Sequence, residues 1–307
     1  MGTTGRGASG DPPRPRVAGR WRGPVAAVAA FALLVVVWEL VKAVVPDDGV
    51  SIGGIRVLPR TSDAAMPHVW TVLGRLFDPE VAGAADQRSI AAAVASGALF
   101  TLRLSLGGLL LGGVLGVLLA LVMQRSALVE RMVLPYVVAS QTVPLIAIAP
   151  LVAGWGGKIA VFGRPWQPWA SVMVIAAYLA FFPIAVGMLR GLTSPRKADV
   201  ELFRALACGW WTTLLRLRLP ASVPYLIPAV RLAAAAAVIG AIVAEISTGT
   251  RGGIGRLIIE YAQSATGDPS RMYTAILGAA VLGLVAAGAV GLLDAALGRY
   301  RSTGAAR

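Results

Sequence analysis

The sequence predicts an all-α membrane protein, a polytopic bundle of about six transmembrane helices. Composition is the first observation: 57% of the 307 residues are hydrophobic, 14% are charged, and the mean hydropathy is +0.73. A soluble domain carries a smaller apolar share and a larger charged share. Segment length is the second observation, because several apolar runs reach the roughly 20 residues that a helix needs to cross a bilayer. None of these runs alternates as a barrel strand does.

The expected spans follow one another along the chain. They cover about residues 25–45, 104–123, 133–152, 169–189, 225–246 and 274–293. The arginines before the first run raise the alternative of a secretory signal. That apolar run is too long for a signal core and ends without a small-x-small cleavage site, so we expect a retained helix.

The charge distribution predicts the orientation. The net charge is +13, from 28 Lys and Arg against 15 Asp and Glu. If residues 1–24, 124–132, 190–224 and 294–307 are internal, they hold most of the unbalanced basic residues, as the positive-inside rule requires. We therefore expect a multi-pass protein of the plasma (inner) membrane with both termini cytoplasmic. A nucleic-acid partner is not expected, because it would need a basic face on a soluble fold.

The domain organisation expected is simple. Residues 1–22, rich in Gly, Pro and Arg, predict a disordered cytoplasmic tail. One transmembrane domain covers 23–300, and a second cytoplasmic tail covers 301–307. With Cys208 and His68 as the single cysteine and histidine, neither a disulfide framework nor a Cys/His zinc site is expected. There is also no phosphate-binding loop and no Ser/His/Asp set, so we expect no enzyme and no cofactor on this chain.

Several residues inside the spans predict packing or a pathway. Gly108, Gly112 and Gly116 repeat every four residues and predict close approach of another helix. Prolines at 135, 144 and 150, with Gln141-Thr142 between them, and Pro183 in the fourth span, predict kinks that either line a path or are purely structural. Pathway candidates are Gln141, Thr142, Pro144 and Glu245.

Ionisable residues in spans are candidates for function by default. Glu39 and Lys42, three residues apart, are expected to pair with each other. Arg231 and Glu245 lie in one span, about 21 Å apart along a helix, so they cannot pair. Glu245 could face a pathway or cap a neighbouring helix.

The internal stretch between the fourth and fifth spans, 193–220, predicts two short amphipathic pieces. Asp199 or Ser194 could cap a helix that runs to about Leu206, and Cys208-Gly209 could break the chain before a second piece bearing Arg216 and Arg218. Such a segment either transmits motion to a soluble partner or lies on the membrane surface.

This stretch resembles the coupling loop of binding-protein-dependent ABC importer permeases. Their motif is E-A-A, three residues, G, nine residues, I-x-L-P. Here Glu201 takes the first position, Leu202 and Phe203 the two alanines, Ala207 the glycine, Leu217 the isoleucine, and Leu219-Pro220 the last pair, with Arg204 and Gly209 inside the loop. The departures are Leu202-Phe203 and Ala207. We take 193–222 as the coupling loop.

The resemblance extends over about 55–300. Leu219–Leu226, Ile242–Glu245, Gly252–Gly255 and Gln141–Leu151 resemble the nitrate, sulfonate and taurine branch, which includes permeases for pyrimidine precursors. It implies a type I ABC importer (MetI-like) architecture and a pathway subunit that pairs with a second copy or a paralogue. It also implies an extracytoplasmic binding protein and a cytoplasmic ATPase that carries the ATP and Mg²⁺.

The resemblance further implies that Glu201 caps or pairs at the ATPase groove and that Pro220 ends the loop. The alternative function is an ion-gradient-driven secondary transporter, which would need embedded acids and often inverted repeats. An intramembrane enzyme is a third class, without paired aspartates or a Ser/His dyad to support it.

Overall fold

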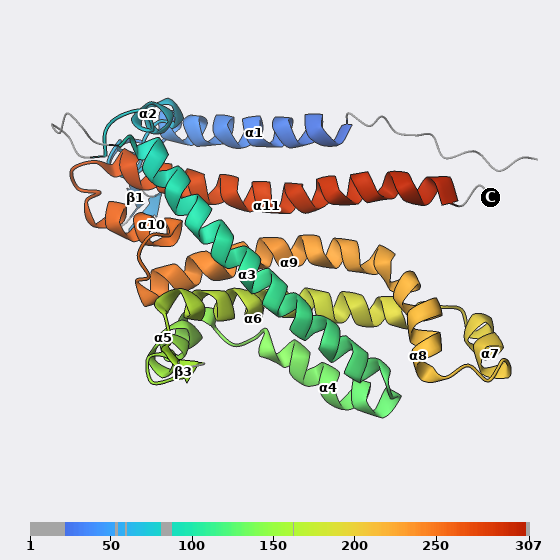
Figure 1. The fold of residues 1–307 in the computed structure, drawn as a ribbon. Coiled ribbons are helices and arrows are strands. Elements are labelled where there is room, and N and C mark those ends of the chain that lie inside the picture. The colour runs from blue at the N-terminus through green and yellow to red at the C-terminus, as the bar shows by residue number, and fades with distance from the viewer. Residues whose placement is uncertain (1–21, 53–54, 59, 81–87, 162, 305–307) are drawn as a thin grey trace, which may run out of the picture. The chain divides into compact units, whose positions relative to one another are not determined.

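A computed structural model of the chain describes residues 22–52, 55–58, 60–80, 88–161 and 163–304 (Figure 1). The chain divides into two units, residues 1–69 and 70–307, which are considered separately. The expected tail over 1–22 lies outside the described residues, except that α1 begins at Arg22.

The first unit consists of one long helix and a hairpin. Helix α1 (Arg22–Val44) coincides with the first expected span, and β1 (Val50–Ile52) pairs antiparallel with β2 (Ile55–Leu58). The chain after the hairpin returns to the end of α1, where Trp38 Nε1 donates to the Pro67 carbonyl at 3.1 Å.

The expected Glu39–Lys42 pair is wrong, because this returning chain supplies other partners to both side chains. Lys42 Nζ lies 2.7 Å from an Asp63 carboxylate oxygen and donates to the Met66 carbonyl at 2.7 Å. Glu39 lies 2.7 Å from His68 Nδ1 and accepts from the Val69 N–H at 2.9 Å. The Lys42 side chain is only 7% exposed, so its charge is satisfied by the folded chain and not by water.

The second unit is a helical bundle. Its elements are α2 (Val69–Arg75, which starts at the unit boundary), α3 (Ile90–Gln124), α4 (Ala127–Ser140), α5 (Leu145–Gly156), β3 (Ala160–Val161), β4 (Arg164–Pro165), α6 (Pro168–Leu192), α7 (Lys197–Ala205), α8 (Trp210–Thr213), a π-helical turn (Leu214–Arg218), α9 (Leu219–Thr248), α10 (Ile254–Gln263) and α11 (Pro269–Gly304). The β3–β4 pair is a minimal antiparallel hairpin. Helices therefore build this unit, as the sequence predicts.

Four helical stretches in the described residues are long and apolar enough to cross a membrane. They are Ile90–Gln124, Pro168–Leu192, Trp210–Thr248 and Pro269–Leu292, and the bent pair α4 and α5 counts as a fifth if it forms one span. Together with α1, these elements match the six predicted segments. The second span is longer than predicted, because α3 begins at Ile90, where the Ser89 hydroxyl accepts from the Ala92 N–H.

The third predicted span is broken and not merely kinked. α4 and α5 meet at 96°, across Gln141–Pro144. Proline disfavours helical backbone in the residue before it and has no N–H to donate, so Pro144 ends one helix and starts the next. Pro135, Pro150 and Pro183, in contrast, lie inside the helices α4, α5 and α6.

The core lies where α6 packs between α3 and α9. A Cβ on Gly112 would lie 2.6 Å from the Ala177 carbonyl oxygen, and one on Gly116 2.7 Å from that of Phe181. The predicted close approach at the glycine repeat is thus confirmed, and its partner is α6. Buried Ile175, Ala180, Ala237 and Ala241 fill the layer between α6 and α9.

Candidate functional site

The predicted coupling loop begins with α7, a short amphipathic helix. Leu202 is 56% exposed, Glu201 and Arg204 are exposed, and Phe203 is half-buried. The expected caps are wrong: Arg196 is the N-cap residue and makes no side-chain cap bond. The reason is competition, since Asp199 forms a bidentate pair with Arg196 at 2.9 Å and the Ser194 hydroxyl donates to the Gly191 carbonyl.

A turn at Ala207 ends α7. The Cys208 N–H donates to the Phe203 carbonyl at 3.0 Å, and the Ala207 N–H donates to the Arg204 carbonyl at 2.9 Å. These two bonds form a Schellman motif, which needs a left-handed residue that is usually glycine. Ala207 has φ 52°, and it stands where the family motif has its glycine. The turn therefore lies one residue before the predicted break at Cys208-Gly209.

The second limb of the loop is continuous with the fifth span. Gly209 is the N-cap residue of α8, which passes through the π-helical turn into α9. Leu217 and Leu219 are half-buried in this limb. Pro220, which was expected to end the loop, stands in the first turn of α9, directly after the π-helical turn.

The two limbs form an elbow, defined here as residues 197–220, that is anchored on one side. Leu214 is 2% exposed and packs with Met188 and Leu192 of α6. The Arg125 guanidinium lies 5.2 Å from the centre of the Trp210 ring. Apolar side chains on the other side of the elbow are exposed: Leu202, Leu206, Trp211 and Leu215 are each 56% exposed or more. Figure 1 shows α7 and α8 at one end of α6 and α9, away from α10.

A cavity of about 320 Å³ opens beside α7. Lys197, Glu201, Arg204 and Arg218 are among the residues that line it, so one carboxylate shares the space with two guanidinium groups and one ammonium group. A charged cavity beside exposed apolar side chains is suited to a protein partner, because such surfaces combine polar contacts with aromatic and aliphatic anchors.

The pathway candidates in the third span lie at the break between α4 and α5. Gln141 is half-buried, whereas Thr142 and Pro144 are exposed. The Tyr178 hydroxyl of α6 donates to the Ser140 carbonyl, and the Thr142 hydroxyl donates to the Ala139 carbonyl. Tyr178 therefore holds the end of α4 against α6, a contact between segments 38 residues apart that no sequence pattern predicts.

Glu245 does not lie with these candidates. Its carboxylate is fully buried, accepts from the Thr101 hydroxyl at 2.8 Å and accepts from the Gly255 N–H at 2.9 Å. The Thr101 oxygen in turn accepts from the Ile254 N–H at 3.0 Å. Glu245 and Thr101 thus cap the first turn of α10 together. Sequence reasoning identified Glu245 as a possible cap but missed Thr101, which is uncharged and 144 residues away.

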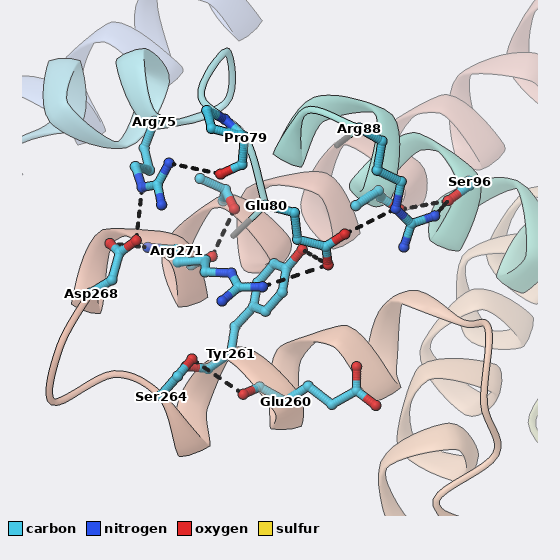
Figure 2. A network of polar contacts seen from close by, with 12 residues as sticks. Arg75, Pro79, Glu80, Arg88, Ser96, Glu260, Tyr261, Ser264, Asp268 and Arg271 are labelled. Atoms are coloured by element: carbon cyan, nitrogen blue, oxygen red, sulfur yellow. Dashed lines mark hydrogen bonds and ion pairs between the residues drawn. The ribbon is translucent and has the colours of Figure 1, made fainter. Parts of the chain in front are cut away.

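A polar network at the same end of the bundle holds α10 and α11 to the chain before α3 (Figure 2). Glu80 lies 2.9 Å from Arg88 Nε and accepts from the Tyr261 hydroxyl at 2.9 Å. The Arg271 guanidinium lies 4.1 Å from the centre of the Tyr261 ring. Beside them, Arg75 Nε pairs with Asp268 at 2.7 Å.

The network shifts the titration of its members. Burial raises the pKa of Glu80, but the hydrogen bonds from Arg88 and Tyr261 and the charges of Arg88 and Arg271 outweigh it, so the pKa is lowered. Burial and the hydrogen bond to Glu80 raise the pKa of Tyr261 to about 12. The network therefore consists of a carboxylate, a neutral phenol and guanidinium groups at neutral pH.

Comparison with known proteins supplies the family. The model of the "Binding-protein-dependent transport system inner membrane component" family matches residues 112–299. The formylaminopyrimidine transport permease protein ThiX of Halalkalibacterium halodurans is 32% identical over 215 residues, which are 70% of this chain and 72% of ThiX. The putative aliphatic sulfonates transport permease protein SsuC of Bacillus subtilis is 29% identical over 199 residues, 64% of this chain and 67% of SsuC.

The fold has a solved counterpart. The crystal structure of an amino acid ABC transporter with histidines aligns with a TM-score of 0.53 and 18% sequence identity, over 68% of this chain and 94% of that one. The fold is therefore that of an ABC transporter permease, and the multi-pass membrane character follows from the apolar helices. By the match of its residues 112–299, the chain belongs to the binding-protein-dependent transport system inner membrane component family, of MetI-like architecture.

Proposed function

We propose that the chain is the permease subunit of an ATP-driven importer, and that the elbow 197–220 docks on a separate cytoplasmic ATPase. The observation that carries this proposal is the elbow itself. Its second limb continues without a break into the fifth span, so a force on α7 and α8 acts directly on α9. Its outer side presents Leu202 and Trp211, exposed by 56% and 67%.

The partners follow from the family. The pathway would form between this chain and a second copy or a paralogue, and a binding protein would deliver a small solute from outside. The relatives ThiX and SsuC are named as formylaminopyrimidine and aliphatic sulfonates transport permeases, which supports a small polar solute as cargo. The elbow end of the bundle is then the cytoplasmic end, in agreement with its basic residues. A secondary transporter has no support from the family match.

A charge-reversal experiment tests the elbow. The full-length permease is reconstituted with its ATPase partner, and ATP-driven uptake and co-purification of the ATPase are measured for Glu201→Lys. Glu130→Lys is the matched control, because Glu130 lies in the first turn of α4, in a different predicted internal segment, 124–132. We expect Glu201→Lys to lose most ATPase retention and uptake, while Glu130→Lys keeps both.

A bulky, uncharged substitution tests ATPase docking without changing the charge of the elbow. Ala207→Trp places a large side chain at the exposed turn of the elbow, and we expect it to weaken ATPase retention as well. Undiminished retention and uptake in both Glu201→Lys and Ala207→Trp would overturn the proposal.

A further inference from the structure

Four arginines line one cavity at the end of the bundle opposite the elbow. The cavity measures about 470 Å³. Arg88 precedes α3, Arg103 lies within α3, Arg251 lies in the connection between α9 and α10, and Arg256 lies in α10. Ser96 and Phe100 lie between the arginines on the wall that α3 forms.

Two of these arginines are neutralised and two are not. Arg88 pairs with Glu80 at 2.9 Å, and Arg256 pairs with Glu260 at 2.7 Å. Arg103 and Arg251 are exposed, and within the described residues neither has a hydrogen-bond acceptor or an ion-pair partner. Two free guanidinium groups that line one cavity favour an anion, above all a phosphate, which accepts bidentate bonds from their planar forks.

The depth of Arg103 along α3 indicates where this anion belongs. Leu106 and Leu110 lie three and seven residues beyond Arg103 on the same helix face and are 50% and 72% exposed. The exposed stripe continues through Val114 and Leu118, at 59% and 54%, and so extends about 22 Å from Arg103. In a bilayer, such a stripe contacts acyl chains, and Arg103 at its end lies at the depth of the headgroups.

A tryptophan marks the same depth independently. Trp169, 46% exposed at the start of α6, lines the adjoining cavity together with Phe100 and Arg251. Tryptophan is enriched at the boundary between hydrocarbon and water. The free arginines and Trp169 therefore lie in one interfacial layer.

We propose that the cavity of Arg103 and Arg251 binds the phosphate headgroup of an anionic phospholipid, whose acyl chains lie along the Leu106–Leu118 stripe of α3. Basic pockets between transmembrane helices recognise anionic headgroups in this way. The bound headgroup bridges α3 and the connection that follows α9, close in sequence to the buried bond by which Thr101 of α3 and Glu245 of α9 join the two helices. A soluble anion would use the arginines but not the apolar stripe.

Native mass spectrometry of the full-length protein tests this site. Dioleoyl-phosphatidylglycerol and dioleoyl-phosphatidylcholine are titrated separately into the detergent-purified protein. We expect the wild type to prefer phosphatidylglycerol and the double variant Arg103→Gln, Arg251→Gln to bind it roughly 30-fold more weakly, or about 5-fold per arginine. The double lysine variant keeps the charge and should retain most of the preference. Arg131→Gln is the matched control. Arg131 is an exposed residue of α4, near the other end of α3, and its variant should bind phosphatidylglycerol as the wild type does.

Three outcomes would overturn the proposal. Equal binding of the two lipids is the first, and wild-type affinity for phosphatidylglycerol in the double glutamine variant is the second. Displacement of phosphatidylglycerol by inorganic phosphate is the third, because it assigns the arginines to a soluble anion. If the double variant does not fold, as judged by size-exclusion chromatography, the single Arg251→Gln variant on the connecting loop decides by the same measurements.

Discussion

The Thr101 hydroxyl donates to the Glu245 carboxylate at 2.8 Å and joins two spans at the buried start of α10. The Gly255 N–H satisfies the same carboxylate at 2.9 Å. Gly253 and Gly255 leave room for it, since a Cβ at Gly253 would lie 2.1 Å from the Glu245 carboxyl carbon. A buried acid persists in an apolar bundle only when such bonds compensate its lost hydration. Glu245 is therefore a structural link between α3, α9 and α10.

Removing this link should destabilise the protein. Glu245→Ala leaves the Thr101 hydroxyl and the Gly255 N–H without their acceptor and opens a cavity, so we expect a loss of about 3 kcal/mol in the free energy of unfolding. Glu245→Gln keeps the volume and one acceptor oxygen, and should lose about half as much. Thermal unfolding in detergent measures both.

Glu201→Ala is the control, because Glu201 is exposed on α7 and its removal should change the unfolding temperature little. If Glu245→Ala unfolds at the wild-type temperature, the link contributes nothing to stability and its geometry needs another explanation.

Replacing Ala207 with glycine should stabilise the elbow. Its φ of 52° costs an alanine about 1 kcal/mol that glycine does not lose. Because the elbow is exposed and can open locally, the gain should appear as slower amide hydrogen exchange over 197–209 in Ala207→Gly. Ala205→Gly, in the last turn of α7 with ordinary helical backbone, should exchange faster. Faster exchange in both variants would contradict the strain at Ala207.

Patterns within one segment predicted the fold, whereas contacts between distant segments did not follow from sequence. Hydropathy located the spans, and the glycine repeat predicted a close helix neighbour, because both are properties of single helices. The resemblance at 201–220 placed a glycine at 207, where the backbone is left-handed. The partners of Glu39, Lys42 and Glu245 come from segments distant in sequence. No pattern around Lys42 predicts its contact with Asp63, and none around Glu245 predicts its contact with Thr101.

The Glu80 network should contribute less to the stability of the protein in acid. Burial raises the pKa of Glu80, but Arg88, Tyr261 and Arg271 lower it below the ordinary value of 4.5. A carboxyl group whose pKa is lower in the folded than in the unfolded protein stabilises the fold above pH 4.5, and this stabilisation is lost as the pH falls through the pKa of the folded state. The wild type should therefore unfold at a higher temperature than Glu80→Gln at neutral pH, and this difference should shrink below pH 4.5. A difference that stays constant into acid would contradict the ionised role of Glu80.

The glycine repeat offers a test of the α3–α6 contact with a neighbouring control. A Cβ on Gly112 would lie 2.6 Å from the Ala177 carbonyl oxygen, which is backbone and cannot move aside alone, whereas one on Gly113 would lie 3.6 Å from Ile184. Gly112→Ala must push the two helices apart, at a cost of about 2 kcal/mol. Gly113→Ala gains helix propensity without a clash and should be neutral or stabilising by about 0.5 kcal/mol. Thermal unfolding compares the two adjacent substitutions, and equal behaviour would show that α3 and α6 do not meet at Gly112. The elbow connects α6 to α9 and does not include α3. Gly112→Ala, which pushes α3 and α6 apart, should therefore lose stability but still retain the ATPase.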